Sequence, residues 1–372
     1  MDLIPITLLT GFLGSGKTTL LNQLVMQAAM KKTLVIINEF GNIGLDHLLV
    51  TNSTDELIVE MSSGCMCCTI RKDLATALRD IVWRFSREGV RQFDRVLIET
   101  TGLADPAPVI HTLVTDGFIA EHYRLDGIIT TVDAVSGSAT LEIHPESVKQ
   151  VAVADRLLLT KTDIAEADEL AALAYRLEGI NPAAQQFLVR NGELNADVVL
   201  NLGLFDPSKK SLDVQNWLNQ EAYTMVSSSR APHRLNYLSR RKSRNSCGHD
   251  HDGEDHHHDV NRHNDRIRAF CYVIDEPVDG VIFEEWMALL TNLMGDKMLR
   301  IKGIVNVRGA DGAVVIHGVQ HIFHSPMMLE QWPSEDRRSR IVFIVRDMKA
   351  TVISETFKQF QLMASAWDEA MP

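Results

Sequence analysis

The stretch GFLGSGKTT, residues 11–19, lies between an apolar run and an amphipathic one. The run before it, IPITLLT, predicts a buried strand, and the residues after it predict a helix. The stretch matches the pattern G-x-x-x-x-G-K-[ST], in which glycines let successive backbone N–H groups curl around a β-phosphate. The helix would point its positive N-terminus at the same anion. The sequence therefore predicts a strand, a phosphate-binding loop and a helix, in that order.

Within this loop two side chains have tasks of their own. Lys17 would bridge the β- and γ-phosphates of a nucleotide, and the Thr18 hydroxyl would ligate Mg²⁺. The alternative is a chance glycine turn, which the flanking strand and helix disfavour. The loop residues expected to contact the nucleotide are Gly11, Gly14, Ser15, Gly16, Lys17, Thr18 and Thr19.

Over the first two hundred residues, short apolar runs alternate with longer amphipathic stretches. Such an alternation is typical of a mainly parallel, doubly wound α/β sheet, which we assign to a domain over 1–206. Strands are predicted at 4–11, 32–40, 56–61, 94–100, 126–134, 155–163 and 185–190. The main helices between them are predicted at 17–30, 69–88, 146–154 and 165–178.

The composition changes in the following part of the chain. Residues 207–265 are expected to be a linker, because 240–265 holds six histidines, many charges and almost nothing apolar. Its Cys247 and histidines such as His249 predict weak, exchangeable metal binding, with a polar spacer as the alternative. Residues 266–372 predict a small α+β domain with an antiparallel sheet and a last helix at 350–364.

A second phosphate-side element is VLIETTGLADP, residues 96–106. Glu99 ends an apolar strand, which is where an acidic residue holds the Mg²⁺ shell in phosphate-loop proteins. Gly102 could offer its N–H to the γ-phosphate and so respond to hydrolysis. The alternative is a glutamate in an ordinary turn.

The stretch LLLTKTD, residues 157–163, predicts the base site. Asp163 is suited to accept two hydrogen bonds from guanine, whereas adenine would face it with an acceptor. The stem of Lys161 can lie over the purine ring. Thr160 stands where the pattern Asn-Lys-x-Asp has asparagine, and we expect the lost amide to leave the phosphate loop and the base less well braced. The order of the three elements favours GTP over ATP.

Three of the five cysteines lie in SGCMCCTI, residues 63–70. Metal binding, a redox pair and structural packing are the alternatives for Cys65, Cys67 and Cys68. Neighbouring cysteines form strained disulfides, and a helix N-terminus lowers the pKa of a thiol. The position at a strand-to-helix junction therefore favours a metal site, for which thiolates select zinc, with cobalt or nickel also compatible.

The loop NEFGNIGLDHLL, residues 38–49, holds further candidates. Glu39 could sense Mg²⁺, position the attacking water or join the thiolates as a ligand, and Asp46 could also orient water. His47 is better explained as a solvated loop residue. A loop that serves both sites would couple the nucleotide state to metal affinity.

Composition limits the class of protein. The formal net charge of −12 argues against a binder of nucleic acid or of an anionic membrane. The cysteines are odd in number and clustered, unlike a disulfide framework. No signal peptide and no run long enough to span a bilayer are visible. We therefore expect a reduced, cytoplasmic protein.

Taken together, the quoted motifs, the His-rich insertion and the C-terminal DKMLRIKGIV and HGVQHIF resemble the CobW-like metal-chaperone GTPases. The resemblance covers nearly the whole chain. It implies a GTPase that binds zinc, cobalt or nickel and delivers metal to a client metalloprotein. Thr160 and a longer His-rich linker depart from the family pattern. An ATP-dependent kinase and a GTP-gated zinc store are the alternatives, and the residues leave the client and the oligomeric state open.

Overall fold

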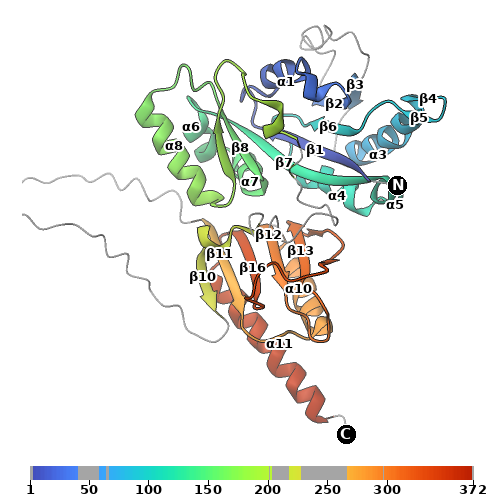
Figure 1. The fold of residues 1–372 in the computed structure, drawn as a ribbon. Coiled ribbons are helices and arrows are strands. Elements are labelled where there is room, and N and C mark those ends of the chain that lie inside the picture. Colours follow the sequence, from blue (N-terminus) through green and yellow to red (C-terminus); the bar gives the residue numbers. More distant parts are fainter. Residues whose placement is uncertain are drawn as a thin grey trace, which may run out of the picture.

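In the computed structural model, residues 3–40, 58–63, 67–200, 202, 218–227, 266–295 and 297–370 are described, with the side chains of 38–40, 58–73 and 364–370 left aside. They form two sheets, each with its own helices, that lie one above the other in Figure 1. Among the described residues, no helix has the length and apolar character needed to cross a bilayer.

The first sheet is parallel throughout, which confirms the predicted doubly wound fold. Its strand order places β1 between β6 and β7, so the chain reverses direction across the sheet at β1. Ligands of such sheets bind at this switch point, outside the carboxyl ends of the strands. In spatial order the strands are β3 (Ile58–Ser63), β2 (Thr33–Phe40), β6 (Arg95–Glu99), β1 (Ile4–Gly11), β7 (Tyr123–Asp133), β8 (Arg156–Thr160) and β9 (Gln185–Leu188).

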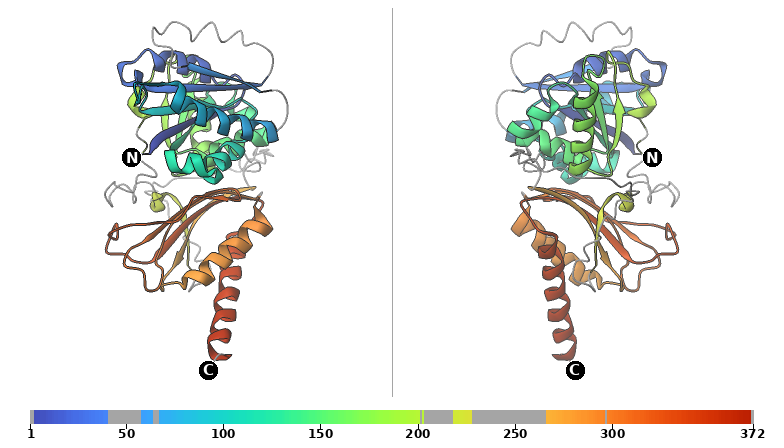
Figure 2. Two further views of the ribbon diagram at one scale, coloured as in Figure 1. Left: turned by 90° about the vertical axis from the view of Figure 1, so that its right-hand side faces the viewer. Right: turned by 90° about the vertical axis from the view of Figure 1, so that its left-hand side faces the viewer.

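Helices cover both faces of this sheet (Figure 2). Alternate residues of β1 explain why: Leu8 packs in one apolar cluster with α3 and α4, and Leu9 packs in another with α1. The helices are α1 (Lys17–Val25), α3 (Cys67–Arg84), α4 (Ala107–Thr115), α5 (Gly117–His122), α6 (Gly137–Ile143), α7 (Pro145–Val153) and α8 (Ala167–Ile180), with short 3₁₀ turns at Ala28–Met30 and Ala196–Val198.

Two predicted helices have different bounds. The helix predicted at 17–30 ends at Val25, because Gln27 takes an extended conformation before the 3₁₀ turn. The helix predicted at 69–88 is α3, which ends at Arg84. A small hairpin of β4 (Ser86–Arg87) and β5 (Val90–Arg91) follows, since Glu88 and Gly89 both have positive φ.

The second sheet is mostly antiparallel, and α10 (Gly280–Met294) and α11 (Ala350–Ala370) cover one of its faces (Figure 2). The helix predicted at 350–364 is α11, which extends to Ala370. The strands are β10 (Thr224–Ser227), β11 (Ile267–Ile274), β16 (Ser339–Arg346), β12 (Met298–Val305), β13 (Val314–Val319) and β14 (Ile322–Phe323), with β15 (Met327–Met328) paired to β13.

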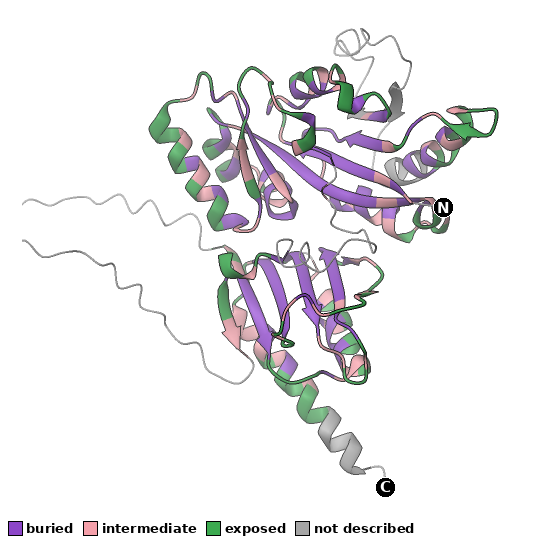
Figure 3. Cartoon of the chain, viewed as in Figure 1, coloured by how far each residue is buried: buried purple, intermediate pink, exposed green. Residues whose placement is uncertain are grey.

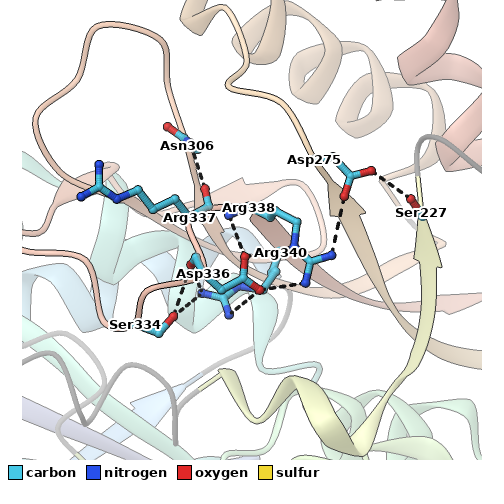
Figure 4. Close-up of polar contacts among 8 residues, drawn as sticks. All are labelled: Ser227, Asp275, Asn306, Ser334, Asp336, Arg337, Arg338 and Arg340. Atoms are coloured by element: carbon cyan, nitrogen blue, oxygen red, sulfur yellow. Dashed lines mark hydrogen bonds and ion pairs between the residues drawn. The ribbon is translucent and has the colours of Figure 1, made fainter.

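Strand β10 is a correction to the predicted linker and to the predicted antiparallel sheet. It lies inside 207–265, after a 3₁₀ turn at Gln220–Ala222, and pairs in parallel with β11. Ser227 at its end donates to Asp275, which also forms an ion pair with Arg338 at 3.6 Å (Figure 4). Hydrogen bonds from Arg338 hold the pKa of Asp336 at about 2. The polar cluster thus ties β10 to the start of β16.

The face of the second sheet opposite its helices meets the first domain. The central strands of the sheet, β11, β16, β12 and β13, are largely buried (Figure 3). At its centre Asp155, which follows α7, accepts hydrogen bonds from Arg300 and from Lys302, the latter at 3.0 Å. Arg300 also donates to the carbonyl of Val153, the last residue of α7. The side chains of Asp155 and Arg300 are 4% and 2% exposed.

In this cluster the Asp155 carboxylate forms ion pairs with two cations, Arg300 and Lys302. Burial alone would raise the pKa of Asp155, but Arg300, Lys302 and the N–H of Ile128 outweigh it, so the pKa is lowered. Burial and the nearby Arg300 lower the pKa of Lys302 to about 8. A carboxylate with a lowered pKa stabilises the fold above its unfolded pKa, and this contribution is lost as the pH falls through the folded value.

We predict that Asp155→Ala lowers the free energy of unfolding by about 3–5 kcal/mol, because it leaves two buried cations without their carboxylate. Urea unfolding at pH 7 measures this. Asp94→Ala is the matched control: Asp94 pairs with Lys32 on the surface, with side chains 61% and 71% exposed, so the loss should stay below about 1 kcal/mol. Equal losses in the two variants would contradict the assignment.

Candidate functional site

The predicted phosphate loop lies at the carboxyl end of β1, between that strand and α1. Gly14 and Gly16 have φ of 72° and 84°, and Gly16 is the N-cap of α1. A Cβ at Gly11 would lie 2.2 Å from the Thr131 hydroxyl. The loop needs glycine at Gly14 and Gly16 for conformation and at Gly11 for space.

Buried hydroxyl groups from neighbouring strands brace this loop through hydrogen bonds. The Thr160 hydroxyl donates to the Ser15 carbonyl at 2.7 Å, and the Ser15 and Thr131 hydroxyls are 2.6 Å apart. The Thr131 hydroxyl in turn donates to the Thr10 carbonyl at 3.3 Å. Thr160 therefore does brace the loop, because a short side chain at the end of β8 reaches the loop backbone directly. That this brace is weaker than the one an asparagine amide would give stays a prediction.

Lys17 lies across the loop itself. Its ammonium donates to the carbonyls of Gly11 at 2.9 Å and Phe12 at 3.1 Å, and the residue is 8% exposed. These contacts hold the cation beside the backbone N–H groups that the glycines expose. The bridging of two phosphates by Lys17 stays a prediction.

Thr18 and Glu99 meet beside the loop. The Thr18 hydroxyl donates to a Glu99 carboxylate oxygen at 3.3 Å, and Glu99 is buried at the end of β6. Thr100 fixes that strand end, since its N–H donates to Leu9 and its hydroxyl to Thr10. A hydroxyl and a carboxylate at one point are oxygen donors of the kind that Mg²⁺ requires, so the pair fits that ion.

The segment after β6 rests against the loop. A Cβ at Gly102 would lie 2.5 Å from the backbone nitrogen of Leu13, so only glycine permits this approach. The Gln150 amide, on α7, donates to the carbonyls of Gly102 at 3.2 Å and Ala104 at 3.0 Å. The sequence analysis missed Gln150, because nothing local marks a helix residue as a partner of a loop 46 residues away.

The predicted base-binding residues Thr160, Lys161 and Asp163 lie at and just after the end of β8. Lys161, with φ of 57°, pairs through its ammonium with Asp133 at 2.7 Å, and Asp163 accepts from the N–H of Asn191 at 3.2 Å. Burial would raise the pKa of Asp133, but Lys161 and backbone N–H groups lower it overall. Asp133 and Asn191 were missed. Their signals were an aspartate that ends the apolar run GIITTVD and an Asn-Gly turn.

The backbone is described for two parts of the predicted metal site. Glu39 on β2 is in register with Ser62 on β3, and Cys67 and Cys68 are the first residues of α3, which follows β3. The side chains of Glu39, Cys67 and Cys68 are outside the described set, and so are Cys65, Asp46, His47 and the histidines of 240–265 in full. The metal site stays a prediction.

The described residues offer no second candidate for a metal site. Within that part of the chain, no group of three or more His, Cys, Asp or Glu side chains could hold a metal ion. Cys271 is buried in β11, and burial raises the pKa of its thiol to about 12. It is therefore a packing residue, in contrast to the clustered cysteines.

Two family models match the chain. The model described as "CobW/HypB/UreG, nucleotide-binding domain" matches residues 5–188, and the model described as "Cobalamin synthesis protein cobW C-terminal domain" matches residues 267–361. The two matches correspond to the two sheets.

Similar proteins extend over nearly the whole chain. It is 31% identical over 347 residues to the zinc chaperone YjiA of Escherichia coli (strain K12), covering 92% of this chain and 94% of that protein. It is 28% identical to zinc-regulated GTPase metalloprotein activator 1 of Schizosaccharomyces pombe, covering 94% and 84%. The crystal structure of Zn(II)-bound YjiA GTPase from E. coli aligns with a TM-score of 0.65 at 26% identity, covering 97% and 99%.

We predict that Thr160→Val weakens the binding of GTP and GDP alike by about tenfold, or about 1.4 kcal/mol, because the Ser15 carbonyl loses its buried donor. Titration with a fluorescent nucleotide measures both affinities. Thr112→Val is the control, since its buried hydroxyl donates to the Pro108 carbonyl within α4. Unchanged affinities in Thr160→Val would show that the hydroxyl brace is dispensable.

Proposed function

This chain belongs to the CobW/HypB/UreG family, and on that basis we propose that it is a GTP-hydrolysing metal chaperone that binds zinc for transfer to a client metalloprotein. One observation carries the proposal: the braced phosphate loop, the Thr18–Glu99 pair and Asp163 lie at the carboxyl ends of one parallel sheet. The chain is also similar to a named zinc chaperone over almost its full length.

The reaction is GTP + H₂O → GDP + phosphate. The chain contributes mainly position and charge, as is usual in phosphoryl transfer. The loop N–H groups and the α1 N-terminus bind the β-phosphate, and Lys17 binds the β- and γ-oxygens. Thr18 and Glu99 would hold Mg²⁺, which when bound supplies positive charge between those phosphates. Gly102 lies against Leu13 on the γ-phosphate side.

Water orientation falls to the loop that follows β2. Glu39 is the penultimate residue of β2, which pairs with β6, and the carboxyl-terminal Glu99 of β6 is in register with Ile37. Glu39 or Asp46 would orient the attacking water, and Gly102 would report the presence of the γ-phosphate. The proposed catalytic residues are thus Lys17, Glu39, Asp46 and Glu99.

Guanine is selected at the other end of the loop. The backbone N–H of Asn191 donates to the Asp163 carboxylate and so restrains its orientation. Asp133 holds the Lys161 ammonium, so that the aliphatic stem has a fixed course beside the base. An ATP-dependent kinase is the alternative, which the departure at Thr160 slightly favours, and the nucleotide preference separates the two.

Zinc is the cargo that thiolates favour, and cobalt and nickel suit the same ligands less selectively. Cys65, Cys67 and Cys68, with Glu39, are the proposed ligands. Because Glu39 also belongs to the loop that reaches the γ-phosphate, hydrolysis would release a ligand or its loop and lower metal affinity. We assign the protein to the cytoplasm, where thiolates stay reduced.

We predict that Asp163→Asn shifts the nucleotide preference from GTP towards xanthosine triphosphate, because an amide presents a donor where guanine needs an acceptor. Steady-state phosphate release with GTP, ATP and xanthosine triphosphate measures the preference. Lys17→Ala is the companion variant and should abolish release with every nucleotide. Turnover in Lys17→Ala would refute the assigned site, and ATP preferred by the wild type would refute the GTPase. A wild type that binds GTP but never hydrolyses it would instead favour the GTP-gated zinc store.

We predict that Zn²⁺ binds more tightly with a non-hydrolysable GTP analogue than with GDP, and that Cys67→Ser removes both the tight site and the difference. Titration against a competing chelator measures the affinities. Cys271→Ala controls for loss of a thiol, and deletion of 245–263 separates weak histidine sites. Equal zinc affinities in the two nucleotide states would rule out the coupling.

A further inference from the structure

The second domain touches the phosphate-side segment at one hairpin tip. Gln320 lies in the turn between β13 and β14, has φ of 53° and is 7% exposed. Its amide donates to both carboxylate oxygens of Asp105, at 3.2 and 2.9 Å. Asp105 belongs to the segment that follows Glu99. A contact that joins residues 215 positions apart is made only by the tertiary fold.

Apolar side chains hold this tip in place. Val319 and Ile322, on either side of the turn, are 0% and 3% exposed and belong to the apolar cluster of the first domain. The same cluster contains Ala107 and Ile110 of α4. The Gln320 amide is therefore presented by a packed element, so its hydrogen bond restrains Asp105 and is not merely a surface contact.

Asp105 collects partners from three elements. Besides Gln320 it accepts from the Lys149 ammonium of α7 at 2.7 Å and from the Ala107 N–H at the start of α4 at 3.0 Å. Burial would raise the pKa of Asp105, but these hydrogen bonds outweigh it and the pKa is lowered. The carboxylate stays ionised and joins the second domain to α7 and α4.

From Asp105 the contacts continue to the phosphate loop. Gln150, next to Lys149, holds the carbonyls of Gly102 and Ala104, and Gly102 lies against the Leu13 backbone. The path from Gln320 to the loop therefore consists of hydrogen bonds, the peptide bonds of neighbouring residues and the close approach of Gly102 to Leu13. The buried Asp155 cluster anchors the second domain at a separate point, after the C-terminal end of α7.

We propose that Gln320 is a positioning residue for the γ-phosphate: it holds Asp105 and through it sets Gly102. The second domain is then part of the GTP site, and bound GTP in return holds the hairpin, since coupling between sites is reciprocal. The inference rests on the proposed GTP site and assigns its regulation to the second domain.

The test compares the affinities of Gln320→Met and the wild type for GDP and for a non-hydrolysable GTP analogue. Methionine keeps the length and removes the donor. We expect the preference for the analogue over GDP to fall at least about fivefold, the lower end of typical site coupling. The GDP affinity should stay within about twofold, because GDP lacks the phosphate that Gly102 would contact. The kcat for GTP should fall with it.

Gln186→Met is the matched control, since Gln186 on β9 donates to the Ala174 carbonyl of α8 at 3.0 Å. Gln320→Lys restores a donor to Asp105 and should recover the preference for the GTP analogue over GDP. If Gln320 only stabilised the fold, that preference would stay impaired in Gln320→Lys. If Gln320→Met does not fold, Gln320→Glu carries the same comparison, because it repels Asp105. An unchanged analogue-to-GDP ratio overturns the inference even where the wild type hydrolyses GTP. A wild type without turnover refutes the GTPase, and the ratio still tests Gln320.

Discussion

The structure depends on holding the backbone of a glycine-rich loop in one conformation at the carboxyl end of β1. Glycines give the loop its left-handed conformations but lose more conformational freedom on folding than other residues. Hydroxyl groups from three neighbouring strands compensate: Thr160 holds the Ser15 carbonyl, Thr131 meets the Ser15 side chain, and Thr100 meets Thr10. The parallel strand order makes this possible, because it gathers the carboxyl ends of β1, β6, β7 and β8 at one edge.

The second domain is joined to the first along α7 and at the start of α4. Asp155, directly after α7, fixes one end through Arg300 and Lys302. Lys149, on the same helix, reaches Asp105, which also binds Gln320 of the second domain. The first joint follows the C-terminal end of α7, and the second adjoins the segment that approaches Leu13 of the predicted phosphate loop. The proposed role of Gln320 requires only the second joint to respond to the nucleotide.

Particular residues show how far local patterns reach. The strand, loop and helix at 4–25 were predictable, because each follows from residues within a few positions. Strand β10 was not, because a four-residue strand in a polar stretch is set by its neighbour β11. Thr160 was read as a deficiency, since its role depends on a carbonyl 145 positions away. The clustered cysteines stay a prediction that rests on their spacing and on the start of α3 at Cys67.

By itself, the sequence predicted the chemistry: a phosphate loop, an acidic strand end, an aspartate expected to bind the base and a thiol cluster, in an order typical of one family. Those features are local, because backbone conformation and strand ends are encoded by adjacent residues. Only the tertiary structure decided which groups brace the loop and that Gln320 reaches Asp105. Such contacts depend on strand order and domain packing, which bring distant residues within hydrogen-bond distance and which no local periodicity specifies.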